Sequence, residues 1–277
     1  MSPSLIYQHG ERRMIKAVIF DLDGTLVRTE ELKALSYARA VMLWKSDVTE
    51  EAVVNAYKEV VGLSRQEVSE YVLRSFHLED AASKRLQMGD GGEPWKALAR
   101  EHVANYIGMI ETPGLLDKYK CPYNAGLLDY VKRGGFRVGL ATLSHRPETE
   151  KILEILGLRG MFDVIATRED VEKGKPDPGV YLLVAHQLGV TPQESLVIED
   201  SVNGIRAALA AGMACIAVTS NITRQSVHES GLVAKQWIVD EPAFLMTVAR
   251  QVIAGERPGS LSTQQSSTDP HRALAQR

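Results

Sequence analysis

A short and mostly apolar run, "MIKAVIF" at residues 14–20, begins the patterned part of the chain. Strands with one exposed face alternate apolar and polar residues, whereas strands buried on both faces have nearly continuous apolar runs. The run therefore predicts a buried strand of a parallel sheet. It ends in two aspartates one residue apart, Asp21 and Asp23, which are followed by Gly24 and Thr25.

The next stretch, residues 29–112, has apolar positions at helical spacing and no convincing strand. Thr29 and Thr49 are predicted to be N-caps, and the second helix is expected to run to Gly62. "SRQE" at residues 64–67 matches a capping box. After the turn-rich "MGDGGEP", Pro94 suits the first turn of a last helix. The pattern predicts about four helices inserted directly after the first strand.

Beyond residue 122 the pattern alternates between strands and helices. Strands are expected at 136–142, 162–167, 195–200 and 214–219, with a short one within 234–240, and helices at 147–156, 177–188 and 201–211. Glycines 157, 189 and 212 are expected to stop these helices. This order predicts an α/β fold, a Rossmann-like parallel sheet with helices on both faces.

Four parts follow from these patterns. They are an N-terminal tail (1–13), a Rossmann-like core (14–28 and 113–254), an inserted all-helical cap (29–112) and a disordered tail (255–277). The last part is rich in Gly, Ser, Gln and Pro, a composition that cannot bury enough apolar surface to fold.

Composition narrows the class of protein. The 277 residues carry a net charge of −3 and are 44% hydrophobic, which is ordinary for a soluble globular protein. The near-neutral charge gives no sign of a nucleic-acid partner, and no run approaches the ~20 apolar residues of a membrane span. Cys121 and Cys215 are far apart, and the start of the chain lacks the order of a secretory signal. We therefore expect a cytoplasmic protein with reduced thiols, as a monomer or homodimer.

Polar side chains follow the predicted strands. The carboxyl ends of parallel strands meet at one edge of a sheet, where ligands bind in open α/β folds. The residues expected there are Asp21, Asp23, Thr142, Ser144, Lys175, Glu199 and Asp200. Four carboxylates this close need a cation, and oxygen ligands suit Mg²⁺.

"DLDGT", "ATLS", "GKPDP" and "VIEDSVNGIRAALAAGM" occur in the order and spacing of four known motifs. Together they resemble the haloacid dehalogenase superfamily, in its phosphatase or beta-phosphoglucomutase-like subfamily with an alpha-helical cap. The resemblance covers about residues 14–247. It implies Mg²⁺-dependent phosphoryl transfer from a small phosphorylated metabolite through an aspartyl-phosphate.

The resemblance makes Asp21 the nucleophile and a metal ligand. Asp23 would be the general acid/base, with its backbone carbonyl on the metal. Family dehalogenases lack this second aspartate, and because an alkoxide leaving group needs a proton, Asp23 favours a phosphate ester. Lys175, which precedes a proline as the family lysine does, would balance the negative charge, and Lys173 would be a solvated surface lysine.

The last motif supplies the remaining metal ligands. Asp200 would be the main carboxylate ligand besides Asp21, with capping of the helix at Ser201 as an additional role. Glu199 would be a ligand or an acceptor for a metal-bound water. An aspartate that often occurs later in this motif has no match here, although Asn203 lies nearby.

Phosphate binding is expected from two segments. Gly24 lets the backbone come close to a phosphate, and the N–H groups at Gly24 and Thr25 would bind its oxygens. Thr142 would donate its hydroxyl to a phosphoryl oxygen. Ser144 would either assist or cap the helix at Pro147, and both roles are compatible.

Three cap residues bear on the substrate. "GLSRQE" resembles a cap loop of beta-phosphoglucomutase-like members, so Arg65 would hold an anionic or sugar-phosphate tail; the alternative is a solvated arginine in a helix's first turn. Lys33 stands where the mutase has a histidine, and His102 where it has a lysine. These departures favour a phosphatase first and a phosphosugar mutase second.

Two further hypotheses have less support. A phosphonate hydrolase assisted by Lys33 conflicts with Asp23, because the family's phosphonatases do not keep that aspartate. A non-catalytic receiver-like module would have no cap and no use for Asp23 as an acid/base.

Overall fold

A computed structural model describes residues 14–88 and 90–255. The predicted tails, 1–13 and 255–277, lie outside these residues except for Gly255, which is described. One six-stranded sheet forms the core, in the order β3-β2-β1-β4-β5-β6, and all its strand pairs are parallel. The strands are β1 (Ala17–Phe20), β2 (Arg137–Ala141), β3 (Val164–Ala166), β4 (Ser195–Glu199), β5 (Ala214–Val218) and β6 (Ile238–Val239). The predicted parallel α/β fold is confirmed.

Helices cover both faces of this sheet, as the buried residues of β1 show. Val18 and Phe20 pack in one apolar cluster with α7, α8 and α12, whereas Ala17 and Ile19 pack in another with α9, α10 and α11. The helices of the core are α6 (Leu115–Tyr119), α7 (Pro122–Arg133), α8 (Arg146–Ile155), α9 (Gly179–Leu188), α10 (Val202–Ala210), α11 (Arg224–Ser230) and α12 (Leu245–Ile253). Short 3-10 turns lie at Arg159–Met161, Arg168–Asp170, Pro192–Glu194, Lys235–Trp237 and Pro242–Phe244.

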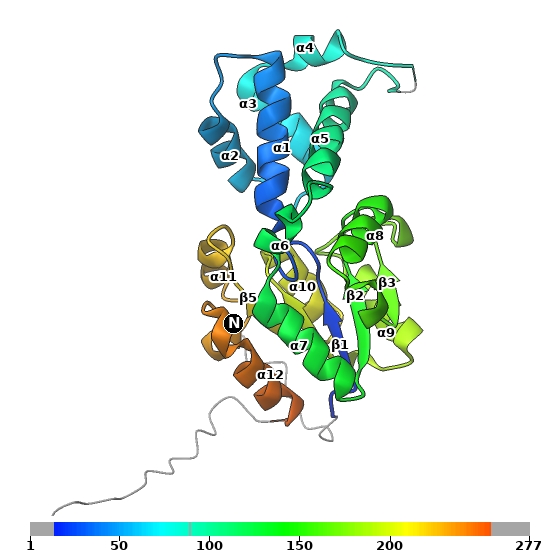
Figure 1. The fold of residues 1–277 in the computed structure, drawn as a ribbon. Coiled ribbons are helices and arrows are strands. Elements are labelled where there is room, and N and C mark those ends of the chain that lie inside the picture. Colours follow the sequence, from blue (N-terminus) through cyan, green and yellow to red (C-terminus); the bar gives the residue numbers. More distant parts are fainter. Residues whose placement is uncertain (1–13, 89, 256–277) are drawn as a thin grey trace, which may run out of the picture.

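The helices inserted after β1 pack around an apolar cluster of their own, and we call them the cap. They are α1 (Thr29–Trp44), α2 (Glu50–Lys58), α3 (Arg65–Phe76), α4 (Glu79–Ser83) and α5 (Pro94–Ile110). The sequence predicted about four helices, and the short α4 is the addition. Figure 1 shows the cap above the core, with α6 between them. No helix among residues 14–88 and 90–255 is both long and apolar enough to span a bilayer.

Several helix ends were predicted correctly. Thr49 caps α2, Ser64 and Glu67 form a capping box at α3, and Pro94 begins α5. Gly189 adopts the left-handed conformation that ends α9. However, α2 ends at Lys58 and a turn carries the chain on to Gly62, so the expected length of this helix was wrong.

Three predicted caps were wrong. The N-cap of α1 is Arg28 rather than Thr29, and that of α8 is His145 rather than Ser144; neither makes a side-chain cap bond. At α10 the N-cap is Ser201, whose hydroxyl accepts from the Gly204 amide, so Asp200 is not the cap. The hydroxyls of Thr29 and Ser144 both bond to Asp23 instead.

Candidate active site

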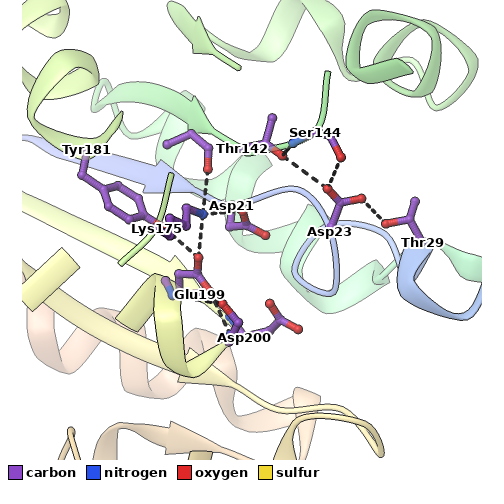
Figure 2. Close-up of polar contacts among 12 residues, drawn as sticks. Asp21, Asp23, Thr29, Thr142, Ser144, Lys175, Tyr181, Glu199 and Asp200 are labelled. Atoms are coloured by element: carbon purple, nitrogen blue, oxygen red, sulfur yellow. Dashed lines mark hydrogen bonds and ion pairs between the residues drawn. The ribbon is translucent and has the colours of Figure 1, made fainter. Parts of the chain in front are cut away.

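The strand order brings the predicted site residues to one edge. Phe20 at the end of β1 lies beside Leu140 of β2 and Ile198 of β4. Asp21, the next residue, donates its amide to the Ile198 carbonyl at 3.0 Å. The residues that follow β1, β2 and β4 therefore meet at the carboxyl edge of the sheet, as Figure 2 shows.

Lys175 lies at the centre of this edge. Its ammonium is 2.7 Å from Asp21 Oδ1 and 2.7 Å from Glu199 Oε1, and it donates to the Ala141 carbonyl at 3.1 Å. The side chain is buried, whereas Lys173 is exposed. Burial opposes the charge, but the two carboxylates outweigh it and raise the pKa of Lys175. The structure thus brings Lys175, and not Lys173, to Asp21.

Glu199 is fully buried and accepts from donors on both oxygens. Lys175 and the Tyr181 hydroxyl donate to Oε1, and the amides of Asp200 and Ser201 with the Ser201 hydroxyl donate to Oε2. Burial opposes ionisation, yet Lys175 and these donors lower the pKa of Glu199. Tyr181 was not predicted, because a tyrosine in an apolar helix has no local signal for a polar role.

Asp200 has the opposite environment. It is 3% exposed, and its carboxylate accepts no hydrogen bond from the residues that the structure describes. Burial and then the charges of Glu199 and Asp21 raise its pKa well above the ordinary value. The pKa of Asp21 is also raised, to about 8. Burial is the main cause, the charge of Lys175 lowers the pKa, and the negative charges of Glu199 and Asp23 raise it. The carboxylates of Asp21 and Asp200 are therefore held close together without enough positive charge nearby to balance them both.

These features fit a divalent cation. Oxygens of Asp21, Glu199 and Asp200 lie within 4.8 Å of one another. A Cβ on Gly24 would overlap the Asp200 carboxylate, so glycine leaves this carboxylate its room. Because Glu199 is saturated with protein donors, Asp21 Oδ2 and Asp200 are the available ligand atoms. The Asp23 carboxylate lies outside the cluster, and its predicted metal contact through the backbone carbonyl stays a prediction.

Asp23 lies among hydroxyl groups and a cap lysine. Ser144 Oγ donates to it at 2.5 Å, Thr142 Oγ1 at 3.3 Å, and Thr29 donates as well. Lys33 of α1 lies 2.8 Å from its Oδ1. Burial opposes ionisation, but Lys33 and the hydroxyls lower the pKa of Asp23. The two aspartates thus have opposite pKa shifts. The role of Thr142 and Ser144 toward a phosphate stays a prediction.

The turn at Gly24 and Thr25 only partly resembles the predicted phosphate loop. Gly24 has a φ of +79°, which favours glycine. Its N–H donates to the Val27 carbonyl at 2.8 Å within the turn, and phosphate binding by Gly24 and Thr25 stays a prediction. The Thr25 hydroxyl is buried without a partner among the described residues. The backbone carbonyl of Thr25 accepts a hydrogen bond from the Asn124 side chain at 2.6 Å.

The cap residues face the same cavity. Arg65 Nη2 lies 2.7 Å from both carboxylate oxygens of Glu148 in α8, so the alternative of a solvated arginine was wrong. His102 is buried, stacks on Tyr37 at 3.9 Å and shares a 2.7 Å hydrogen bond with Ser36. Its burial lowers its pKa well below the ordinary value. The ion pair was not predicted, because Glu148 carries no local signal that relates it to Arg65.

A cavity of about 1010 Å³ connects the two sets of residues. The sheet edge contributes Asp21, Asp23, Lys175 and Asp200, and the cap contributes Lys33, Arg65, His102 and Tyr106. A cavity of this size can hold a small molecule that contacts both the sheet edge and the cap.

Comparison with known proteins decides the family. A model of haloacid dehalogenase-like hydrolases matches residues 15–212, more than half of the chain. The chain belongs to this family. The motif-based resemblance is therefore confirmed, and the chain is an enzyme of the phosphatase and beta-phosphoglucomutase-like branch.

Three relatives illustrate the range of this family. The phosphorylated carbohydrates phosphatase of Thermotoga maritima is 28% identical, over 86% of this chain and 100% of its own. Hexitol phosphatase B of Escherichia coli is 32% identical, over 74% and 84%. The structure of a CbbY mutant from Rhodobacter sphaeroides, in complex with xylulose-(1,5)bisphosphate, has a TM-score of 0.61 and 28% identity, over 83% of this chain and 96% of that one.

Proposed function

We propose that this family member is a Mg²⁺-dependent phosphatase that hydrolyses a small phosphomonoester, a sugar phosphate or a similar metabolite, through an aspartyl-phosphate. The observation that carries the proposal is the contrast between two neighbouring aspartates. Asp21 lies in the carboxylate cluster against Lys175, whereas Asp23 lies against hydroxyls and Lys33. Paired carboxylates with diverging pKa values are typical of divided catalytic roles. A cytoplasmic location and a monomer or homodimer stay predictions.

Asp21 is assigned the nucleophile. Its carboxylate, which accepts from Lys175 on Oδ1, attacks phosphorus and forms the aspartyl-phosphate as the ester oxygen departs. Lys175 offsets the charge that develops on the phosphoryl oxygens, and Glu199 with Tyr181 holds Lys175 in place. Asp21, Asp200 and the Asp23 carbonyl would hold Mg²⁺, which supplies positive charge for the phosphate and the carboxylates.

Asp23 is assigned the proton transfers. In the first half-reaction it protonates the leaving alkoxide, and in the second it removes a proton from the water that attacks the aspartyl-phosphate. Lys33 and the hydroxyls favour its ionised form, which suits the second half-reaction. For the first, the substrate must displace part of these donors, and the two donors from α1 of the cap, Lys33 and Thr29, are those that cap movement would remove.

A phosphosugar mutase would use the same groups with a sugar hydroxyl in place of water. The mutase remains the second candidate, because the chain resembles solved beta-phosphoglucomutase-like structures and has a cavity lined by both cap and core. The phosphatase is favoured because His102 is neutral, buried and bonded to Ser36, so it does not supply the charge of the mutase lysine.

The test is phosphate release from a generic phosphomonoester. We expect turnover only with Mg²⁺, none in Asp21→Asn, and wild-type turnover in the control Asp129→Asn, which removes an exposed carboxylate on α7. Undiminished turnover in chelator or in Asp21→Asn would overturn the proposal. Isomerisation of a hexose phosphate without release of phosphate would select the mutase.

A further inference from the structure

An ion pair between cap and core lines the cap end of the cavity. Arg65 Nη2, at the start of α3, is 2.7 Å from both oxygens of Glu148 in α8. The Glu148 side chain is 7% exposed and that of Arg65 is 25% exposed. A buried carboxylate this close cancels most of the positive charge that Arg65 would otherwise present to a bound molecule.

The other basic side chains that line the cavity, within the described residues, are already engaged with protein partners. Six of them line the cavity within the described residues: Lys33, Arg65, Lys96, Arg100, Arg168 and Lys175. Five form ion pairs with acidic side chains. The sixth, Arg168, donates to the carbonyls of Val171 and Glu172. A second phosphate beside Arg65 would therefore meet Glu148, and each basic side chain that lines the cavity within the described residues already has a partner in the protein.

Uncharged hydrogen-bonding groups lie at the same end. The Tyr106 hydroxyl is buried and has no partner among the described residues, although the ring lines the cavity. The Ser36 hydroxyl donates to the Lys33 carbonyl at 2.6 Å, so it accepts from His102 Nδ1. That tautomer leaves His102 Nε2 as an acceptor. Groups of this kind suit the hydroxyls of a sugar or polyol.

We infer that Glu148 determines the charge of the substrate that the cavity accepts. By neutralising Arg65 it selects a monophosphate with an uncharged, hydroxylated tail and rejects a bisphosphate. The rejection arises because the second phosphate would face a buried carboxylate of like charge in a site of low dielectric. The inference rests on the proposed phosphatase activity and adds a specificity-determining residue to it.

The test compares kcat/KM for glucose 6-phosphate and glucose 1,6-bisphosphate with Mg²⁺. We expect wild type to favour the monophosphate. Glu148→Gln should raise the ratio of bisphosphate to monophosphate by about tenfold or more, mainly through KM, because one like charge is removed. Glu148→Asp should keep the wild-type preference. The control is Glu150→Gln, a half-exposed glutamate on the same helix whose ion pairs are with Arg146 and Arg159.

Arg65→Gln gives an independent test if Glu148→Gln does not fold. It leaves the negative charge of Glu148 uncompensated, so turnover of the bisphosphate should fall further. For the same reason kcat/KM for glucosamine 6-phosphate, which carries a positive amine, should rise relative to that for glucose 6-phosphate. An unchanged ratio in either folded variant would overturn the inference, since an ion pair that only holds the cap would affect all substrates equally. If wild type hydrolyses no phosphomonoester, the proposed function itself fails.

Discussion

Gly204 provides the sharpest test of the structure, because helix propensity and packing predict opposite results for Gly204→Ala. Gly204 lies in the first turn of α10, and alanine in a helix is favoured over glycine by about 0.5–1 kcal/mol. However, a Cβ at this position would overlap the carboxylate of Glu199, far inside the 3.0 Å that real Cβ atoms keep. Glu199 is fully buried and cannot turn away into solvent.

The expected loss of stability follows from the contacts that the Glu199 carboxylate makes. Moving its carboxylate breaks the 2.7 Å contact with Lys175 and the bond from Tyr181. Breaking a buried pair costs about 3–5 kcal/mol, so after the helix gain we expect a net loss of about 2–4 kcal/mol. The melting temperature should fall by about 4–16 °C, at about 2–4 °C per kcal/mol for a chain of this size.

Gly126→Ala is the matched control. Gly126 lies on the exposed side of α7, and a Cβ there meets nothing within 4 Å. This variant should gain about 0.5–1 kcal/mol and keep its turnover. Thermal unfolding and phosphate release are measured on both variants. If Gly204→Ala matched Gly126→Ala in stability, or turned over like wild type, the close packing of Glu199 against Gly204 would be wrong.

Three further predictions concern single side chains. Asp23→Asn should bind Mg²⁺ in calorimetry but release phosphate about 10²–10⁴-fold more slowly, and a wild-type rate would remove its proton-transfer role. Tyr181→Phe deletes one donor to buried Glu199 and should cost about 1–3 kcal/mol in urea unfolding; an unchanged midpoint contradicts this. Burial opposes ionisation of Glu169, but His145 and backbone amides lower its pKa from 4.5 to about 2. The ionised Glu169 therefore stabilises the folded protein above pH 4.5, and this contribution is lost as the pH falls toward 2. Between these pH values the melting temperature of Glu169→Gln should fall less steeply than that of wild type.

The fold and the gathering of the candidate site residues at one edge of the sheet could be predicted because both follow from local patterns. Residues buried on both faces of β1 give a continuous apolar run, and glycines such as Gly189 end helices by their own conformation. Parallel pairing then places whatever follows the strands at one edge, which is why Asp21 and Asp200 come together.

The hydrogen-bond and ion-pair partners of individual side chains could not be predicted in the same way. Thr29 and Ser144 are residue types that cap helices, but Asp23 offers their hydroxyls a charged acceptor, and charge-assisted bonds are stronger. Arg65 and Glu148 are 83 residues apart, and their pairing depends on how the cap sits on the core. Such contacts depend on tertiary structure, for which a single sequence provides no periodic signal.

The chain leaves the core for the cap and returns from it at neighbouring points. Val27 forms backbone bridges with both Asp23 and Lys120, and Arg28 donates its amide to the Tyr119 carbonyl. A linker of a few residues could therefore replace the whole cap without disturbing the strand pairs of the core. The helices that line one side of the cavity and the carboxylates at the sheet edge are thus joined along the chain only through this junction, so the two parts can change independently of each other.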